Sequence, residues 1–108
     1  MATNNQLMNG VLTATTSMYV ISMITQNKLC VLQRVAGMFS RYRINIEHIN
    51  ISRHTEELSY WNVVIYTEEN KIKLLLKQLR KIIEMIDVKI IDTVPMVNFT
   101  KPLLRDSF

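Results

Sequence analysis

Apolar residues between Met18 and Val94 form six successive periodic segments, and their order limits the folds open to the chain. Short runs rich in β-branched and aromatic residues indicate strands, whereas apolar residues at i, i+3, i+4 and i+7 indicate helices. The resulting order is strand, helix, strand, strand, helix, strand. It predicts an α+β, ferredoxin-like βαββαβ fold, in which two helices cover one face of a four-stranded antiparallel sheet.

The four predicted strands span residues 18–25, 44–53, 58–67 and 86–94. The first and third are apolar on both faces, so they are expected to be covered on both sides. In the second strand the apolar phase slips between Ile46 and Ile49, which indicates a bulge. Pro95 is expected to end the last strand.

The first predicted helix spans residues 31–42, and its apolar stripe consists of Leu32, Val35, Ala36 and Phe39. Gly37 inside this helix costs roughly 1 kcal/mol relative to alanine, and a close approach to the sheet would explain it. The second helix follows the acidic residues 68–69. Its stripe is predicted to contain Ile72, Leu75, Leu76, Leu79, Ile82 and Ile83.

The sheet face opposite the helices is expected to carry several large apolar side chains. An apolar patch of this size rarely stays exposed to water. A chain of 108 residues also buries only about two-thirds of the surface of its unfolded form. We therefore expect the open face or an edge of the sheet to be an interface, most simply in a homodimer.

Composition narrows the class of protein. The formal net charge of +4 permits contact with nucleic acid or an acidic partner, but a lysine-rich solvated helix face is the favoured explanation. The single cysteine, Cys30, excludes an internal disulfide and a cysteine metal site, and it favours a cytoplasmic protein. The sequence shows no signal peptide and no apolar run near the roughly 20 residues of a membrane span.

Residues with catalytic potential do not form a recognisable constellation. His48 and His54 lie about 20 Å apart along a strand and cannot share a metal ion. Cys30 begins a helix, where a thiolate is stabilised, but no histidine lies near it in sequence. We therefore predict no catalytic residue, no metal site and no cofactor in this chain.

Three segments, residues 20–28, 31–49 and 79–88, resemble an ACT domain, and more narrowly the regulatory small subunit of acetohydroxyacid synthase (acetolactate synthase) in its short form. The most specific string is L-x-R-V-x-G-x-F-S-R at residues 32–41, followed by N-I-E at residues 45–47. The ACT domain is assigned to residues 18–94. Residues 1–17 and 95–108 show no clear apolar period and are predicted to be an N-terminal arm and a C-terminal tail.

The resemblance also implies a mechanism. Two ACT domains pair, and a branched-chain amino acid, typically valine, binds at their interface. Free N–H groups at the start of the first helix suit the ligand carboxylate. The positions that match the family's effector site are Asn27, Cys30, Val31, Leu32, Asn45 and Ile46. The chain would dock on a catalytic large subunit that carries thiamine diphosphate and magnesium, raise its activity and convey feedback inhibition. Neither nucleic acid nor a membrane is an expected partner.

The chain departs from the family pattern at two positions, because Cys30 and Arg43 stand where glycine is usual. Glycine there lets the backbone approach a ligand and adopt unusual angles.

Two other functions share the βαββαβ order. RNA-recognition domains stack bases on aromatic residues of the third strand, and Tyr60, Trp61 and Tyr66 supply aromatics without the glycine-aromatic signature. A small phosphatase would need an anion-binding loop with a fixed arginine, which residues 26–30 lack.

Overall fold

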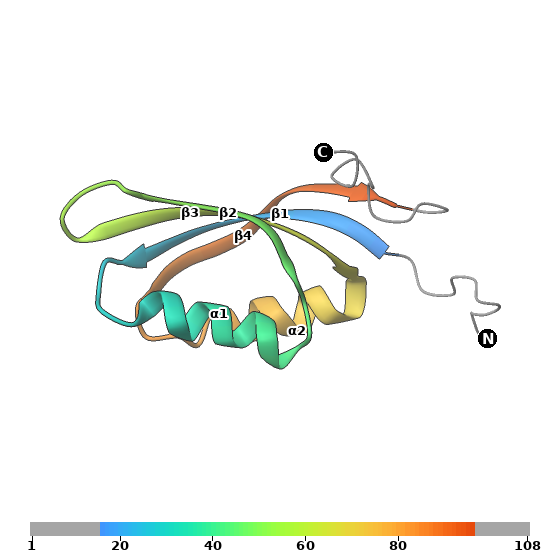
Figure 1. The fold of residues 1–108 in the computed structure, drawn as a ribbon, viewed down its shortest axis with the longest axis horizontal. Coiled ribbons are helices and arrows are strands. Elements are labelled where there is room, and N and C mark those ends of the chain that lie inside the picture. Colours follow the sequence, from blue (N-terminus) through green and yellow to red (C-terminus); the bar gives the residue numbers. More distant parts are fainter. Residues whose placement is uncertain (1–15, 97–108) are drawn as a thin grey trace.

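The computed structural model describes residues 16–96. The elements follow in the order β1 (Thr16–Gln26), α1 (Val31–Arg41), β2 (Ile46–Arg53), β3 (Leu58–Glu68), α2 (Glu69–Leu79) and β4 (Met85–Pro95) (Figure 1). This order, with two helices and a four-stranded antiparallel sheet, confirms the predicted fold class. The predicted arm and tail lie mostly outside the described residues, so the domain boundaries stay predictions.

The sheet has the strand order β2-β3-β1-β4, so β1 and β3 are central and β2 and β4 are the edges. β1 pairs with β3 along its whole length, from Thr16 opposite Glu68 to Gln26 opposite Leu58. The register between β2 and β3 shifts between Ile46 and His48, which confirms the predicted bulge.

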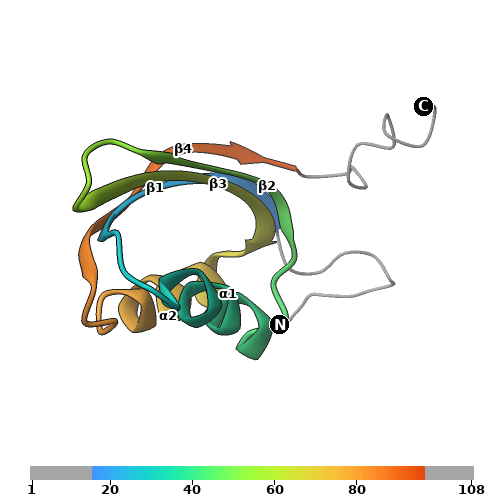
Figure 2. The same ribbon diagram turned by 60° about the vertical axis from the view of Figure 1, so that its left-hand side comes forward.

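The core lies between the two helices and the inner face of the sheet, where both helices pack side by side (Figure 2). Odd-numbered residues of β1 and β3 point into this core and are buried, because side chains alternate across a strand. The largest fully buried side chains include Phe39, Ile21, Met23, Ile65, Ile72, Leu75 and Leu79. Trp61 also lies in this layer, and its Nε1 donates a buried hydrogen bond to Thr25 Oγ1 at 3.0 Å.

Three details of the predicted helices are wrong. α2 ends at Leu79, so Ile82 is buried from a turn and Ile83 is 90% exposed. The core-facing residues of α1 are Val31, Val35 and Phe39, whereas Leu32 is 53% exposed. Gly37 is exposed, and a Cβ placed there would meet no atom within 4 Å, so no close approach to the sheet explains it.

The outer face of the sheet is less uniformly apolar than the sequence suggests. A polar row crosses it, because Asn62 of β3 pairs with both Asn50 and Ser22, and Ser22 pairs with Lys89 of β4. This row separates Ile24 and Tyr60 at one end from Met18 and Tyr66 at the other. None of the helices within residues 16–96 is long and apolar enough to span a membrane.

Candidate functional site

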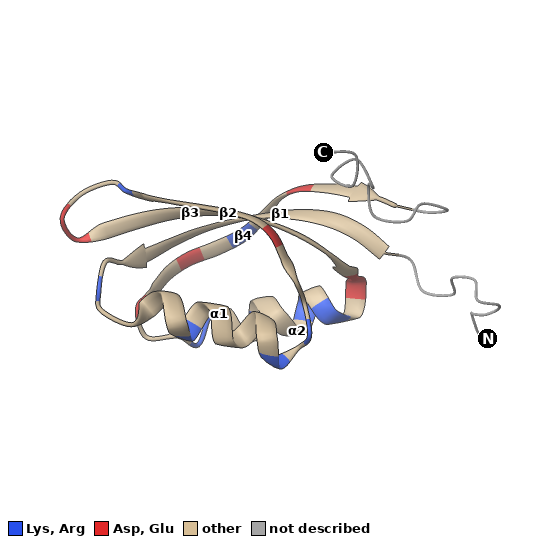
Figure 3. Cartoon of the chain, in the orientation of Figure 1, with Lys and Arg blue, Asp and Glu red and all other residues tan. Residues whose placement is uncertain are grey.

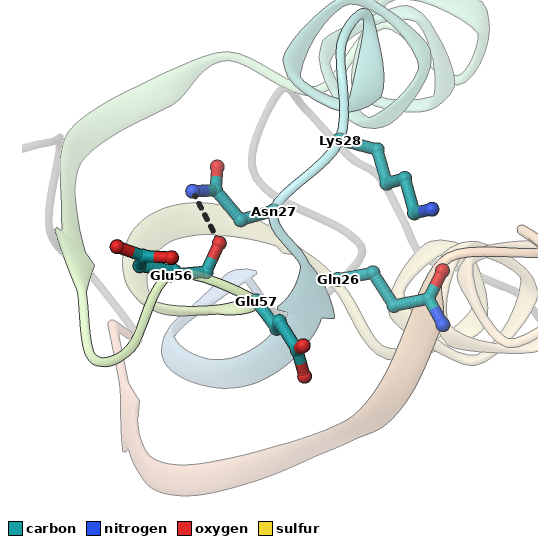
Figure 4. A pocket seen from close by; sticks show the side chains of 5 residues that line it. All are labelled: Gln26, Asn27, Lys28, Glu56 and Glu57. Atoms are coloured by element: carbon teal, nitrogen blue, oxygen red, sulfur yellow. Dashed lines mark hydrogen bonds between the residues drawn. The ribbon is translucent and has the colours of Figure 1, made fainter.

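The loop between β1 and α1, residues 27–30, is held from two sides. On one side, Asn27 N donates to Glu57 O at 2.7 Å, and Asn27 Nδ2 donates to Glu56 O at 3.4 Å (Figure 4). On the other side, Gln26 N donates to Glu84 O at 2.8 Å. The loop is therefore fixed between the β2–β3 hairpin and the turn that joins α2 to β4.

A hollow of about 460 Å³ lies where this loop meets the hairpin. Its lining residues are all polar or charged: Gln26, Asn27, Lys28, Glu56 and Glu57 (Figure 4). Charges of both signs border the hollow, because Lys28 comes from the loop and the two glutamates come from the hairpin. Such a lining suits a small ligand that carries both an anionic and a cationic group.

The backbone is left-handed at two residues that are not glycine. Cys30, the residue before α1, has φ 72°, and Arg43, in the turn after α1, has φ 58°. The left-handed conformation costs an L-residue with a Cβ roughly 1–2 kcal/mol. These are the two positions at which the sequence resemblance predicts glycine, and the backbone there has the conformation that glycine favours.

Replacing Cys30 or Arg43 by glycine should stabilise the protein. Each change relieves the strain of the left-handed backbone, but glycine also raises the conformational entropy of the unfolded chain. We therefore expect a net gain of about 0.5–1 kcal/mol in the free energy of unfolding. Urea denaturation would measure this gain. Cys30→Ala and Arg43→Ala are the matched controls, because alanine keeps the strain. An equal gain from alanine would show that the lost side chain, and not the backbone, is responsible.

An ion pair joins α1 to the turn between α2 and β4. Arg34 Nη2 of α1 donates to Glu84 Oε2, whose side chain is largely buried. Burial alone would raise the pKa of Glu84. Hydrogen bonds from Arg34 and from the backbone of Glu84 itself lower this pKa, as do the positive charges of Arg34 and Lys28. These effects outweigh burial, so the pKa of Glu84 lies below its usual value. The pair therefore stays ionised at neutral pH and is lost only when the pH falls through this lowered pKa.

The predicted effector residues fall into two groups at opposite ends of α1. Asn27, Cys30 and Leu32 are exposed at its start, whereas exposed Asn45 and half-buried Ile46 follow its end. Val31 is buried in the core. Its backbone N–H donates to Lys28 O at 3.4 Å.

An 11-residue helix is about 16 Å long, so one small amino acid cannot contact both groups within one chain.

The sequence did not single out four of the five residues that line the hollow. Gln26, Lys28, Glu56 and Glu57 are ordinary polar residues of a loop and a turn, and only the β1–β3 register brings them together. The sequence did contain a signal for this proximity. Two antiparallel strands of equal length place the end of one beside the start of the other, so the end of β1 lies beside the start of β3. Within residues 16–96, no group of three histidines, cysteines or carboxylates could hold a metal ion.

Base stacking on the sheet is disfavoured. Trp61 of β3 is buried beneath the helices, and Tyr60 on the outer face stacks against His54 with ring centroids 4.4 Å apart. Asp87 and Asp92 of β4 add negative charge to the sheet (Figure 3). Because Lys89 lies between these two aspartates on the same face, the outer face of β4 has a net charge of −1, which does not attract a phosphate backbone.

Comparison with known proteins assigns this chain to a family. Residues 21–87 match the family described as AHAS small subunit-like ACT domain, AHAS being acetohydroxyacid synthase. A "Probable acetolactate synthase small subunit" from Archaeoglobus fulgidus is 35% identical over 71 residues, which cover 65% of this chain and 45% of that protein. A protein of the same name from Methanothermobacter thermautotrophicus is 33% identical over 72 residues, which cover 66% of this chain and 43% of that protein.

Solved structures agree with this assignment. The acetolactate synthase small subunit from Thermotoga maritima superposes with a TM-score of 0.62 and 30% identity, covering 69% of this chain and 47% of that chain. The ACT domain of GTP pyrophosphokinase from Chlorobium tepidum superposes with a TM-score of 0.61 at 20% identity, covering 68% of this chain and 96% of that chain, and supports the fold alone. The chain spans less than half the length of the curated relatives it matches.

Proposed function

The chain belongs to the AHAS small subunit-like ACT domain family, and we propose that it is a regulatory subunit of acetolactate synthase that pairs with itself and binds an amino acid effector. The observation that carries this proposal is the position of the loop at residues 27–30, where a polar hollow, a helix start and a left-handed backbone coincide.

A second copy of the chain would complete the effector site. Two copies related by a two-fold axis perpendicular to the sheet place identical edge strands side by side and antiparallel. Pairing through β2 would bring Asn45 and Ile46 of one copy toward Arg53 of the other, since β2 runs from Ile46 to Arg53. Arg53 precedes the hairpin that contacts Asn27. The two groups of predicted residues would then meet across the interface, twice in each dimer.

β2 is the edge better suited to this pairing. β4 has two register shifts, Lys89 and Pro95, all of which hinder strand addition, whereas the one register shift of β2 lies at its start, between Ile46 and His48. The central part of β2, residues 48–52, contains neither lysine nor proline.

Exposed apolar side chains lie along this edge. Ile49 and Ile51 lie on the helix-side face of β2 and are 37% and 40% exposed. Leu32 and Arg34 are two residues apart in α1, so their side chains point to opposite flanks of the helix. Arg34 pairs with Glu84 in the turn after α2. Leu32 therefore faces the other flank, toward β2. We call Leu32, Ile49 and Ile51 the edge patch.

The proposed protein partner is the catalytic subunit of acetolactate synthase, because the relatives named above are small subunits of that enzyme. In this proposal catalysis, with thiamine diphosphate and magnesium, belongs to the partner. This chain contributes an effector site and a contact surface. The effector changes the partner's activity because it binds more tightly to one of two conformational states of the complex than to the other.

Titration calorimetry of the full chain with valine, leucine and isoleucine tests the proposal, with the mass of the particle followed by light scattering. We expect a dimer that binds one of the three with about one ligand per chain, as two equivalent interface sites require. Alanine and D-valine serve as controls for side chain and stereochemistry. A monomer, or a dimer that takes up none of the three amino acids, would contradict the proposed effector function.

A further inference from the structure

Charge is divided unevenly between the two layers of the domain (Figure 3). The helices and their flanking turns, residues 27–45 and 69–84, carry nine Lys or Arg and two Glu. The strands and the β2–β3 hairpin, residues 16–26, 46–68 and 85–96, carry two Lys or Arg and six Asp or Glu. The two helix-layer glutamates also lie beside cations, since Glu84 pairs with Arg34 and Glu69 lies 3.5 Å from Lys73. The helix layer is therefore the positive side of the domain.

The basic charge is densest on α2 and the turn after it, and two exposed apolar side chains lie on the same segment. Leu74 is 48% exposed on the outer face of α2, directly opposite the buried stripe. Lys73 precedes it and Lys77 lies one turn further along the same face. Lys81 and the 90% exposed Ile83 follow in the turn after the helix. Exposed apolar side chains bordered by polar ones fit the apolar core and polar rim of a protein–protein interface.

This turn is also bonded to the two elements that flank the loop at residues 27–30. Glu84 O accepts a hydrogen bond from the backbone N–H of Gln26, the last residue of β1, and the Glu84 carboxylate pairs with Arg34 of α1. The turn at residues 80–84 therefore holds both elements that the loop at residues 27–30 connects. A ligand that shifts the loop would therefore act on the turn. A partner bound at α2 and this turn would lie next to the site that senses the effector.

We propose that the outer face of α2 and the turn at residues 80–84 form the docking surface for the catalytic subunit, and that this subunit presents an acidic surface with an apolar recess there. This inference rests on the proposed function and deepens it by naming the surface and the chemistry of its partner. Acidic protein is favoured over nucleic acid, because Leu74 and Ile83 would find no apolar counterpart on a phosphate backbone.

The test measures the affinity of the full chain for the purified acetolactate synthase catalytic subunit from the same genome, at low and moderate salt. Lys77→Glu reverses one charge on the docking surface, and Lys89→Glu makes the same change in charge on β4 as the matched control. We expect Lys77→Glu to weaken binding by roughly tenfold and to flatten its dependence on salt, while Lys89→Glu binds like the unchanged protein. Leu74→Ser should also weaken binding, with the salt dependence retained.

Each other outcome has a definite meaning. Equal binding by the unchanged chain, Lys77→Glu and Leu74→Ser would overturn the docking surface and leave the proposed function standing. Failure of the unchanged chain to bind the catalytic subunit would overturn both, and the amino acid titration above then shows whether an effector-binding dimer remains. Binding of a mixed-sequence DNA or RNA duplex that depends on Lys77 would overturn the choice of an acidic protein.

Discussion

Replacing Ile51 by lysine should convert a dimer of this protein into monomers. Ile51 lies on the helix-side face of β2, opposite buried Trp61, and its partly exposed side chain belongs to the edge patch. In a β2–β2 dimer the patch would be covered, and a two-fold axis would place two Ile51 side chains near each other. Two buried like charges there would cost several kcal/mol, so we expect the dimer to weaken by at least roughly a hundredfold.

Light scattering across a dilution series measures this change, and a thermal melt checks that the variant still folds. Ile91→Lys on β4 is the matched control, since Ile91 is 52% exposed on the opposite edge strand. We expect Ile91→Lys to remain dimeric. A folded Ile51→Lys protein that is still a dimer would place the interface elsewhere, on the outer sheet face or on β4.

The β-sheet was readily predictable because its residues follow a period of two. Buried residues alternate with half-buried or exposed ones along β1 and β3, and this alternation requires no knowledge of the partner strand. The bulge in β2 was visible for the same reason, since an extra residue shifts the apolar phase between Ile46 and Ile49.

The helix errors have a common physical cause. Apolar residues at helical spacing mark a stripe, but the stripe does not say where the helix stops or which flank is covered. Ile83 extends the stripe of α2 in sequence, yet the chain turns after Leu79 and leaves it exposed. Leu32 continues the pattern of α1, yet it lies beyond the area that the sheet of a single chain covers. Both are now candidates for contacts with other chains.

The sequence supports proposals for single site residues but not for their arrangement in space. Asn27 and Asn45 were predicted together, and only the structure shows that α1 separates them. The positions of Cys30 and Arg43 were predicted as departures from a glycine pattern, and the structure supplies the reason for that pattern in the positive φ angles. The hollow itself depends on strand register, which brings Glu56 beside Asn27.

Alanine substitutions at Asn27 and Asn45 should each abolish strong effector binding, although the two residues lie at opposite ends of α1. A hydrogen bond to a charged ligand group contributes about 1.5–3 kcal/mol, so each change should weaken binding by roughly tenfold to a hundredfold. Asn27→Ala also removes the side-chain contact to Glu56 O, so a urea melt must show that the loop stays folded. Asn62→Ala, on the exposed outer face of β3, is the control and should bind normally.

Mixing the two variants separates a shared site from two independent ones. If each site takes Asn27 from one copy and Asn45 from the other, neither variant alone contains an intact site. A heterodimer of Asn27→Ala with Asn45→Ala contains one site in which both asparagines are present. Random exchange of subunits should therefore restore about a quarter of the sites, with the affinity of the unchanged protein. Calorimetry of the equilibrated mixture measures this fraction. A mixture that binds no better than its components would mean that no effector site is divided between Asn27 and Asn45 of two copies.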